Sequence, residues 1–210
     1  PDVLFGPFAL SLEAKAFGAT TIQLPDTPPI VSRPALKSPT DIAELKRPDV
    51  AHDLNLRFLV DAVEAVVADQ GGKRPVAAPI TAPTDLPILL MGMENWLQVL
   101  LFEPELAKAW SGLALDHFEA LAAAYFKAGA SFLVAPVMLV SPALVNAELA
   151  KRLIIPMLRK AFSSLDGPIV FHHGGNRIAE CLGNLKDLPN IAGFVVDEGD
   201  SLSAVRRTRS

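Results

Sequence analysis

Histidine, asparagine and acidic side chains gather in two short segments that follow apolar runs. The first segment is 172–176, with the sequence HHGGN, and the second is 197–200, with the sequence DEGD. Each follows an apolar run, 169–171 or 191–196, that has the length and composition of a buried strand. Because ligands gather at the carboxyl ends of parallel strands, these two segments are the candidate site.

The histidine segment contains side chains suited to ligand binding. On an extended backbone His172 and His173 point to opposite faces, so one is expected to face the site and the two cannot easily share a metal ion. Gly174 and Gly175 permit positive φ and a close approach of the backbone to a ligand, and Asn176 can cap a following helix. The alternative is a glycine-rich turn with an incidental histidine pair, since no HxxxH or CxxC spacing accompanies it.

The acidic segment places Asp197, Glu198 and Asp200 directly after an apolar strand. Carboxylates buried there without partners would be costly, so they are either solvated or paired with a cation such as a metal ion. The alternative is that Asp200 caps the last helix and Glu198 faces water.

Strands and helices are expected to alternate from residue 53 onward. Boundary residues and periodicity predict helices at 53–70, 104–127, 141–150, 156–162, 176–185 and from 200 onward, and apolar runs predict strands at 75–80, 131–135, 169–171 and 191–196. Strands that are apolar throughout favour a parallel sheet built from βα units. An open doubly wound sheet suits 210 residues, whereas an eight-unit barrel usually needs about 250.

The first 50 residues differ from the rest in being rich in proline, with six prolines between residues 25 and 48 alone. Each proline fixes φ and removes a backbone donor, so this segment is expected to wrap around the βα units. Within it only two short helices are predicted, at 11–17 and 38–45. Further along, His117 is interpreted as a half-buried side chain and Cys181 as a small buried residue within a helix.

Composition narrows the class of protein. The formal charge of −4 gives no general attraction to nucleic acid or to an anionic membrane. The single cysteine allows no intrachain disulfide, so a reducing compartment, the cytoplasm, is expected. The apolar runs 86–93 and 97–102 are shorter than the roughly 20 residues of a membrane-spanning helix. Pro1 in the first position, without a signal-peptide pattern, indicates a trimmed or internal start.

Several segments resemble the uroporphyrinogen decarboxylase superfamily. Residues 79–83 and 90–95 are similar to its GP(F/V)T and (L/M)GMEN stretches, 14–18 to EAEAFG, 104–105 to KPE, 171–176 to LHxCGN and 196–198 to (V/L)DE. The similarity runs in order across nearly the whole chain. It is closest to the branch of corrinoid-dependent methyltransferases that includes the methylcobalamin:coenzyme M methyltransferases.

The resemblance implies an α/β fold of the (β/α)8 TIM-barrel type, as one domain over 1–210, that is incomplete in this chain. Roughly the last three units would be absent, and an unclosed barrel exposes strand edges and apolar interior. The alternatives are that residues outside 1–210 complete the barrel, that a partner such as a second copy in a homo-oligomer does, or that the chain is a remnant with altered packing.

Methyltransferases of this branch bind zinc through a histidine, a cysteine two residues later and a second cysteine far downstream. The zinc holds the acceptor thiol as a thiolate, which is the nucleophile. His172 matches the histidine, Gly174 stands at the first cysteine position, and the second would lie beyond Ser210. His172 and Glu198 are then the remaining metal ligands, too few for a tight tetrahedral site.

The leading hypothesis implied by the resemblance is methyl transfer between a corrinoid, as methylcobalamin or a corrinoid protein, and a thiol or other small acceptor. The candidate catalytic residues are His172, Glu198 and Asp197, and the candidate cofactor-binding residues are Asn176, Gly174, Gly175, Met91 and Asn95. One alternative is a metal-independent decarboxylase of the uroporphyrinogen type. The other is a barrel that binds a corrinoid or another ligand without turnover.

Overall fold

A five-stranded parallel sheet forms the centre of the computed structural model, which describes residues 2–70, 72–179 and 181–209. The strands lie in the order β1 (Leu4–Phe5), β4 (Val76–Pro79), β5 (Phe132–Pro136), β6 (Ile169–His172) and β7 (Ile191–Val195). All four pairings are parallel, so the five carboxyl ends lie on the same side of the sheet. The four strands expected from the sequence are confirmed, and β1 is a fifth.

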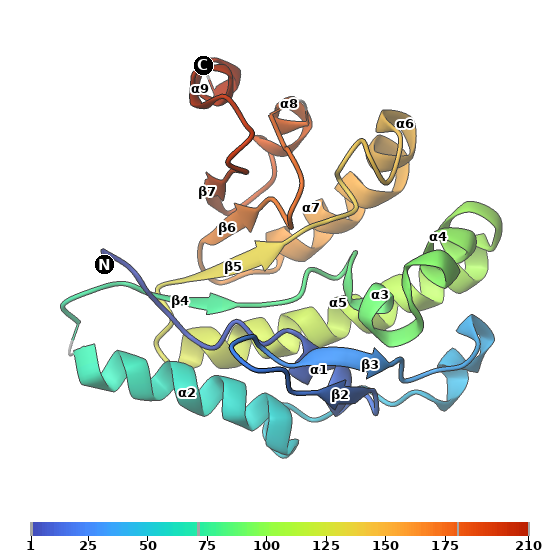
Figure 1. Cartoon of the computed structure of the whole chain (residues 1–210), viewed down its shortest axis with the longest axis horizontal. Helices are drawn as coiled ribbons and strands as arrows, with labels where there is room; N and C mark the ends of the chain where they lie inside the picture. Colours follow the sequence, from blue (N-terminus) through green and yellow to red (C-terminus); the bar gives the residue numbers. More distant parts are fainter. Residues whose placement is uncertain (1, 71, 180, 210) are drawn as a thin grey trace.

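Helices connect and cover the strands. They are α1 (Ser11–Ala16), α2 (Leu54–Gln70), α3 (Leu86–Met91), α4 (Met93–Phe102), α5 (Pro104–Lys127), α6 (Ala147–Leu149), α7 (Ile155–Ser163), α8 (Leu182–Leu185) and α9 (Leu202–Arg209). The described residues also form a 3₁₀ helix, η1 (Pro39–Glu44), and a π-helical segment, η2 (Ala150–Ile154). In Figure 1 the long helices α2 and α5 run side by side below the sheet, and β4 and β5 point toward the side where α3, α4 and α6 lie.

The proline-rich first 50 residues contribute more than a wrapping segment. β1 joins the parallel sheet through its pairing with β4. β2 (Thr20–Ile22) and β3 (Ile30–Arg33) form an antiparallel hairpin, which lies beside α1 in Figure 1. The expectation of two short helices is confirmed by α1 and η1. The three strands were missed because they are two to four residues long and depend on partners, not on a local pattern.

Two helices expected from the sequence do not form as predicted. Ser141 begins a single turn and not a helix: its hydroxyl oxygen accepts the N–H of Ala143, and the turn ends before Asn146. The helical segment begins after Asn146, whose side chain accepts the N–H of Leu149 at 2.8 Å. Of the helix expected at 176–185, α8 alone is present among the described residues. Asn176 therefore caps no helix; its amide donates to the carbonyl oxygen of Gly174 at 3.3 Å.

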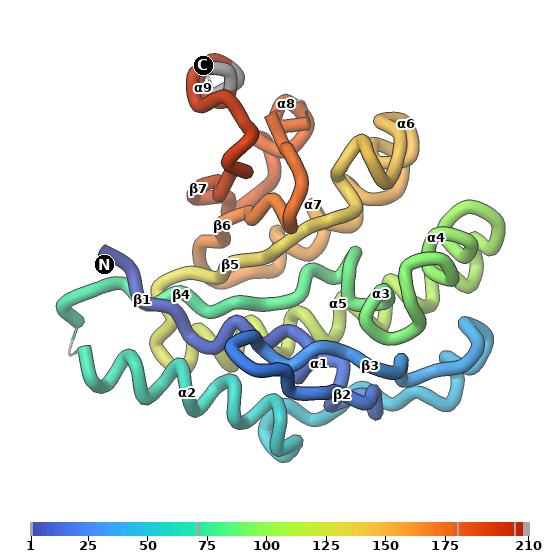
Figure 2. Tube along the Cα trace, in the orientation of Figure 1, coloured from blue at the N-terminus to red at the C-terminus, as the bar shows by residue number. Residues whose placement is uncertain are grey.

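The sheet is open at both ends in the described part of the chain, since β1 pairs with β4 alone and β7 with β6 alone. Figure 2 shows these two strands at opposite ends of the sheet. Apolar side chains near the open ends remain accessible, with Phe5 52% and Val195 37% exposed. The described residues contain no helix that is both long and apolar enough to cross a membrane.

Candidate functional site

The turn after β6 holds the two histidines side by side. Their rings stack at a centroid distance of 4.5 Å and an angle of 19°. The N–H of Gly174 donates to Nδ1 of His172, and the N–H of Gly175 donates to Nδ1 of His173, both at 3.1 Å. Both glycines have positive φ, which turns the backbone back toward the rings. The expectation that the two side chains point to opposite faces is wrong, because this turn replaces the extended backbone on which it depended.

The turn after β7 lies against the histidines. Oδ2 of Asp197 is 3.6 Å from Nδ1 of His173, and both side chains are mostly buried. The carboxylate of Asp200 accepts the N–H groups of Ile178, Ala179 and Asp197. Asp200 thus ties the β7 turn to the chain that follows the β6 turn, a role that sequence reasoning did not assign to it. Glu198 is exposed, and among the described residues no hydrogen bond or ion pair joins it to either histidine.

The turn after β4 contributes a buried carboxyl group that sequence reasoning missed. Asp85 is 6% exposed, and its Oδ2 accepts the N–H of Met138, in the turn after β5, at 3.0 Å. Oδ1 has no hydrogen-bond partner among the described residues. Burial raises the pKa of Asp85 to about 7, against the opposing effect of the N–H groups of Met138 and Leu139 and the hydroxyl of Thr84. The available signal was an acidic residue directly before the apolar run 86–93.

The turns after β5 and β6 are in direct contact. A Cβ built on Gly174 would lie 3.2 Å from the carbonyl carbon of Val137 and 3.3 Å from the amide nitrogen of Met138. On the other side, the ring of Phe8, which follows β1, lies 5.9 Å from the ring of His172. The segments that follow all five strands are therefore connected by contacts. The segment after β6 contacts those after β1, β5 and β7, and the segment after β5 contacts the one after β4.

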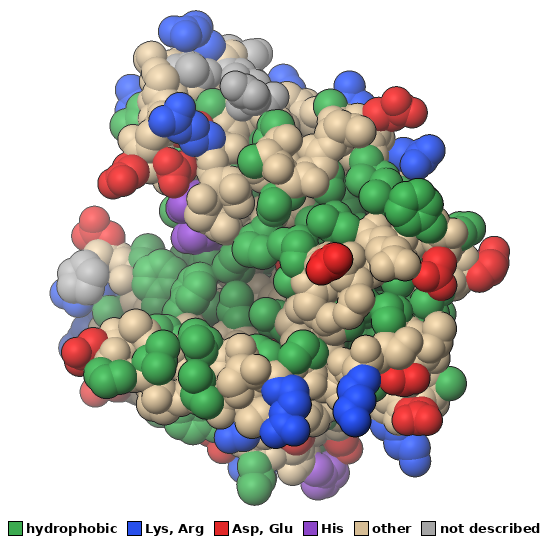
Figure 3. All heavy atoms as spheres, turned by 45° about the vertical axis from the view of Figure 1, so that its right-hand side comes forward, with side chains coloured by type: hydrophobic (Ala, Val, Ile, Leu, Met, Phe, Trp, Pro, Cys, Tyr) green, Lys and Arg blue, Asp and Glu red, His purple; other side chains and the backbone are tan. Residues whose placement is uncertain are grey.

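His172 lies at the centre of this cluster. Burial lowers the pKa of His172 below its usual value, and electrostatic interaction with neighbouring His173 lowers it further, so the ring of His172 is neutral at pH 7. Phe8 beside it is 41% exposed. Figure 3 shows histidine side chains on the wall of a hollow whose surface is largely apolar. This arrangement offers a polar ring to a ligand that also has an apolar part.

A second buried polar network holds the first two strand ends together. Oε1 of Glu13, on α1, accepts the N–H and the hydroxyl of Thr81, after β4, at 2.8 and 2.7 Å. Its Oε2 lies 3.0 Å from Nε2 of His117, on α5. Glu13 and His117 are 0% exposed, so the expectation of a half-buried histidine understated its burial. Glu13 was not selected from the sequence because its partners lie 68 and 104 residues away.

The remaining candidate residues make contacts between or beside helices, away from His172. Asn95, on α4, donates from its side-chain amide to the carbonyl oxygen of Met91, on α3, at 2.8 Å, and Met91 is buried. This contact joins the two helices. Cys181 is buried, as expected, but it precedes α8 and its Sγ contacts the carbonyl oxygen of Ile178 at 3.3 Å.

The donor set does not fit a zinc ion. Over 2–70, 72–179 and 181–209, no three histidine, cysteine, aspartate or glutamate side chains are arranged so that they could hold one metal ion. Gly174 offers no ligand at the position where the resemblance implies a cysteine, and Nδ1 of His172 is occupied by a backbone N–H. A structural zinc site needs four protein ligands and a catalytic site three.

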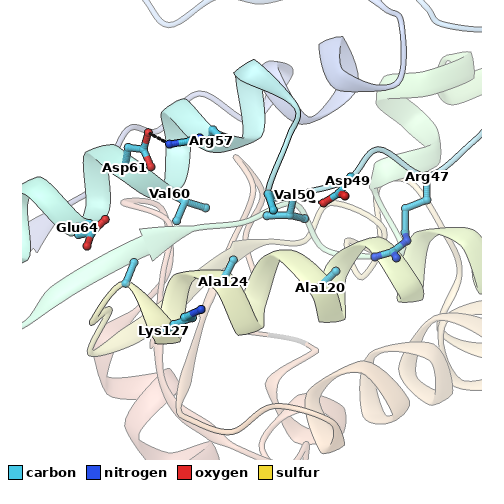
Figure 4. A pocket seen from close by; sticks show the side chains of 12 residues that line it. Arg47, Asp49, Val50, Arg57, Val60, Asp61, Glu64, Ala120, Ala124 and Lys127 are labelled. Carbon is cyan, nitrogen blue, oxygen red and sulfur yellow. Dashed lines mark hydrogen bonds and ion pairs between the residues drawn. The ribbon is translucent and has the colours of Figure 1, made fainter.

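A wide groove lies away from the strand ends. It has a volume of about 640 Å³ and runs between α2, α5 and residues 47–51 (Figure 4). Its floor contains Val50, Val60 and alanines of α5, and its rim carries charges of both signs, including the ion pair between Arg57 and Asp61. None of its lining residues follows a strand of the parallel sheet. The groove is therefore separate from the candidate site.

Comparison with known proteins gives consistent matches. The family model of uroporphyrinogen decarboxylase (URO-D) matches residues 1–210. A methylated-thiol–coenzyme M methyltransferase of Methanosarcina mazei is 28% identical over 174 residues, which are 80% of this chain and 46% of that protein. The solved structure of a methyltransferase from Methanosarcina mazei matches the whole chain with a TM-score of 0.88 at 18% identity, over 62% of its own length.

These matches define the fold and its extent. The structural match shows that the open sheet belongs to a TIM-barrel type of architecture that is not closed, as the sequence predicted. The chain spans about half the length of the curated relative and less than two thirds of the solved structure.

Proposed function

Because the chain belongs to the uroporphyrinogen decarboxylase family, we propose that it takes part in methyl transfer between a corrinoid and a small thiol. The family resemblance found in the sequence is confirmed by the family model. The curated relative acts, by its name, on a methylated thiol and coenzyme M, which supports a thiol as the methyl acceptor. The corrinoid, as methylcobalamin or carried by a corrinoid protein, is the methyl donor in this proposal.

One observation carries the proposal: the segments that follow the strands meet around His172. In enzymes with parallel β/α architecture, substrates bind at this end of the strands. His172 would orient the acceptor, and Asn176 would hold the glycine turn through its bond to Gly174. Asp197 and Glu198 would supply negative charge beside the glycine turn. The apolar side chain of Phe8, next to His172, would hold the hydrocarbon part of the ligands.

The structure also favours a second candidate function, a binding module without turnover. Gly174 stands where the resembling enzymes have a zinc-binding cysteine, and the residues present do not fit zinc. A chain of this kind would bind a corrinoid or a thiol and release it unchanged. The single cysteine is compatible with a reducing compartment, and a cytoplasmic location is part of the proposal.

Replacement of His172 tests the proposal. We expect the wild-type chain to convert methylcobalamin in the presence of coenzyme M, followed by the change in corrinoid absorbance. His172→Ala should slow this reaction at least about 100-fold, as expected when a positioned polar group is removed from a reacting centre. His52→Ala is the matched control, because His52 is 83% exposed and pairs with Asp49 away from the strand ends.

Each other outcome has a defined meaning. Corrinoid binding without turnover would favour the binding module. A spectral response to a porphyrinogen and none to a corrinoid would favour the decarboxylase alternative. Turnover that His172→Ala leaves unchanged would show that the chemistry lies elsewhere.

A further inference from the structure

The backbone at position 174 disfavours the cysteine that the resemblance implies there. The φ angle of Gly174 is +61°, a conformation that residues with a Cβ rarely adopt. A Cβ would also lie 3.2 and 3.3 Å from backbone atoms of Val137 and Met138, which cannot turn away as a flexible side chain can. Gly175 has φ +86° but nothing within 4 Å of its built Cβ. The steric limit is therefore specific to position 174.

The hydrogen bonds of the turn determine what the imidazoles can do. A neutral imidazole has one nitrogen that donates and one that accepts. Nδ1 of His172 accepts the N–H of Gly174, so its ring proton is on Nε2. Nδ1 of His173 accepts the N–H of Gly175 in the same way. A metal ion at Nε2 would require the ring proton to move to Nδ1, which would break the hydrogen bond from the N–H of Gly174.

The surroundings of His172 select the class of ligand. Phe8, which is 41% exposed, packs beside its ring, so apolar surface adjoins the imidazole. The carboxylate of Asp197 lies near His173 and not in contact with His172, among the described residues. A ligand at His172 would therefore meet one N–H donor and an apolar wall, which suits a small organic thiolate.

We propose that the turn at 172–176 is a metal-free site in which the Nε2–H group of His172 binds the sulfur of a small organic thiolate. The inference deepens the proposed function, on which it rests, by assigning the thiol side of the reaction to this turn. A hydrogen bond to the thiolate favours the charged form and lowers the pKa of the bound thiol, and the thiol proton passes to solvent. The turn thus does by hydrogen bonding what zinc does in the resembling enzymes.

The first test measures zinc. We expect the wild-type chain and Gly174→Cys to bind zinc no more tightly than His172→Ala does, in titrations of the metal-free protein. Gly174→Cys should also lower the melting temperature by about 5 °C more than Gly175→Cys, because one substitution meets backbone and the other meets open space. Stoichiometric zinc in the wild-type chain that is lost in His172→Ala would overturn the proposal, and this result does not require the cysteine variants to fold.

The second test observes the ring itself. The chain has four histidines, so nitrogen NMR of the imidazoles can resolve each ring. We expect His172 to be protonated on Nε2, and ethanethiol, but not ethanol, to shift its Nε2 signal while the exposed His52 stays unchanged. A proton on Nδ1 of His172, or no response to ethanethiol, would contradict the proposal. Thiol binding without methyl transfer would leave this inference standing while the proposed function fails.

Discussion

Glu13→Ala is expected to lower the free energy of unfolding by about 3–5 kcal/mol, because it leaves three buried polar groups without their partner at roughly 1–3 kcal/mol each. The carboxylate of Glu13 accepts two hydrogen bonds from Thr81 and lies 3.0 Å from His117. All three residues are buried, so water cannot replace the carboxylate as the hydrogen-bond partner of Thr81 and His117. Denaturant unfolding, followed by the fluorescence of the two tryptophans, measures the loss.

The matched control for this variant is Glu105→Ala. Glu105 is an exposed glutamate in the first turn of α5, the helix that carries His117, so its removal should change stability by no more than about 0.5 kcal/mol. Glu13→Gln keeps the size of the side chain and should fall between the two. A loss below about 1 kcal/mol in Glu13→Ala would show that the network contributes little. Because Thr81 follows β4, the same variant should also loosen the strand ends that form the candidate site.

Asp85→Asn is expected to stabilise the chain at pH 8 and to remove most of the pH dependence of its stability between pH 5 and 8. Burial raises the pKa of Asp85 from 3.8 to about 7, so in the folded chain the carboxyl group keeps its proton over a range in which the unfolded chain has lost it. The folded state then binds more protons than the unfolded state between pH 3.8 and 7. Stability therefore falls as the pH rises through this window and becomes level above it.

The size of this effect follows from the pKa difference. At about 1.4 kcal/mol per pKa unit, the raised pKa of Asp85 lowers the free energy of unfolding at pH 8 by roughly 4 kcal/mol. Of this loss, about 3 kcal/mol develops between pH 5 and pH 8. Asparagine has the same shape, stays uncharged and can still accept the N–H of Met138. Urea unfolding at pH 5 and pH 8 measures the difference, with Asp166→Asn at an exposed position as the control. Equal pH dependence in the wild-type chain and Asp85→Asn would contradict the assignment.

The elements that form by local rules were predictable. Pro104 and Lys127 bound α5 as expected, because a proline suits the first turn of a helix and a basic side chain the last. The strands at 76–79 and 132–136 were recognised because a buried parallel strand is apolar along its whole length. The carboxyl ends of these strands also indicate where a ligand is expected to bind.

The errors fell where local preference competes with distant contacts. β1 has two residues, Leu4 and Phe5, and is a strand because β4, more than 70 residues later, supplies its hydrogen-bond partners. The helix expected from Asn176 does not begin there, because the chain after the glycine turn is held by the carboxylate of Asp200. Neither partner can be inferred from the residues nearby.

By itself, the sequence determined the family, the alternation of strands and helices, and the segments that carry the candidate site, because these depend on composition and on spacing along the chain. Tertiary structure decided how the site is built. It stacked His172 on His173, placed Gly174 against the backbone of the β5 turn and buried Asp85. These features arise between segments that are separated by tens of residues, and the energy of a buried polar group depends on which partners the fold brings to it.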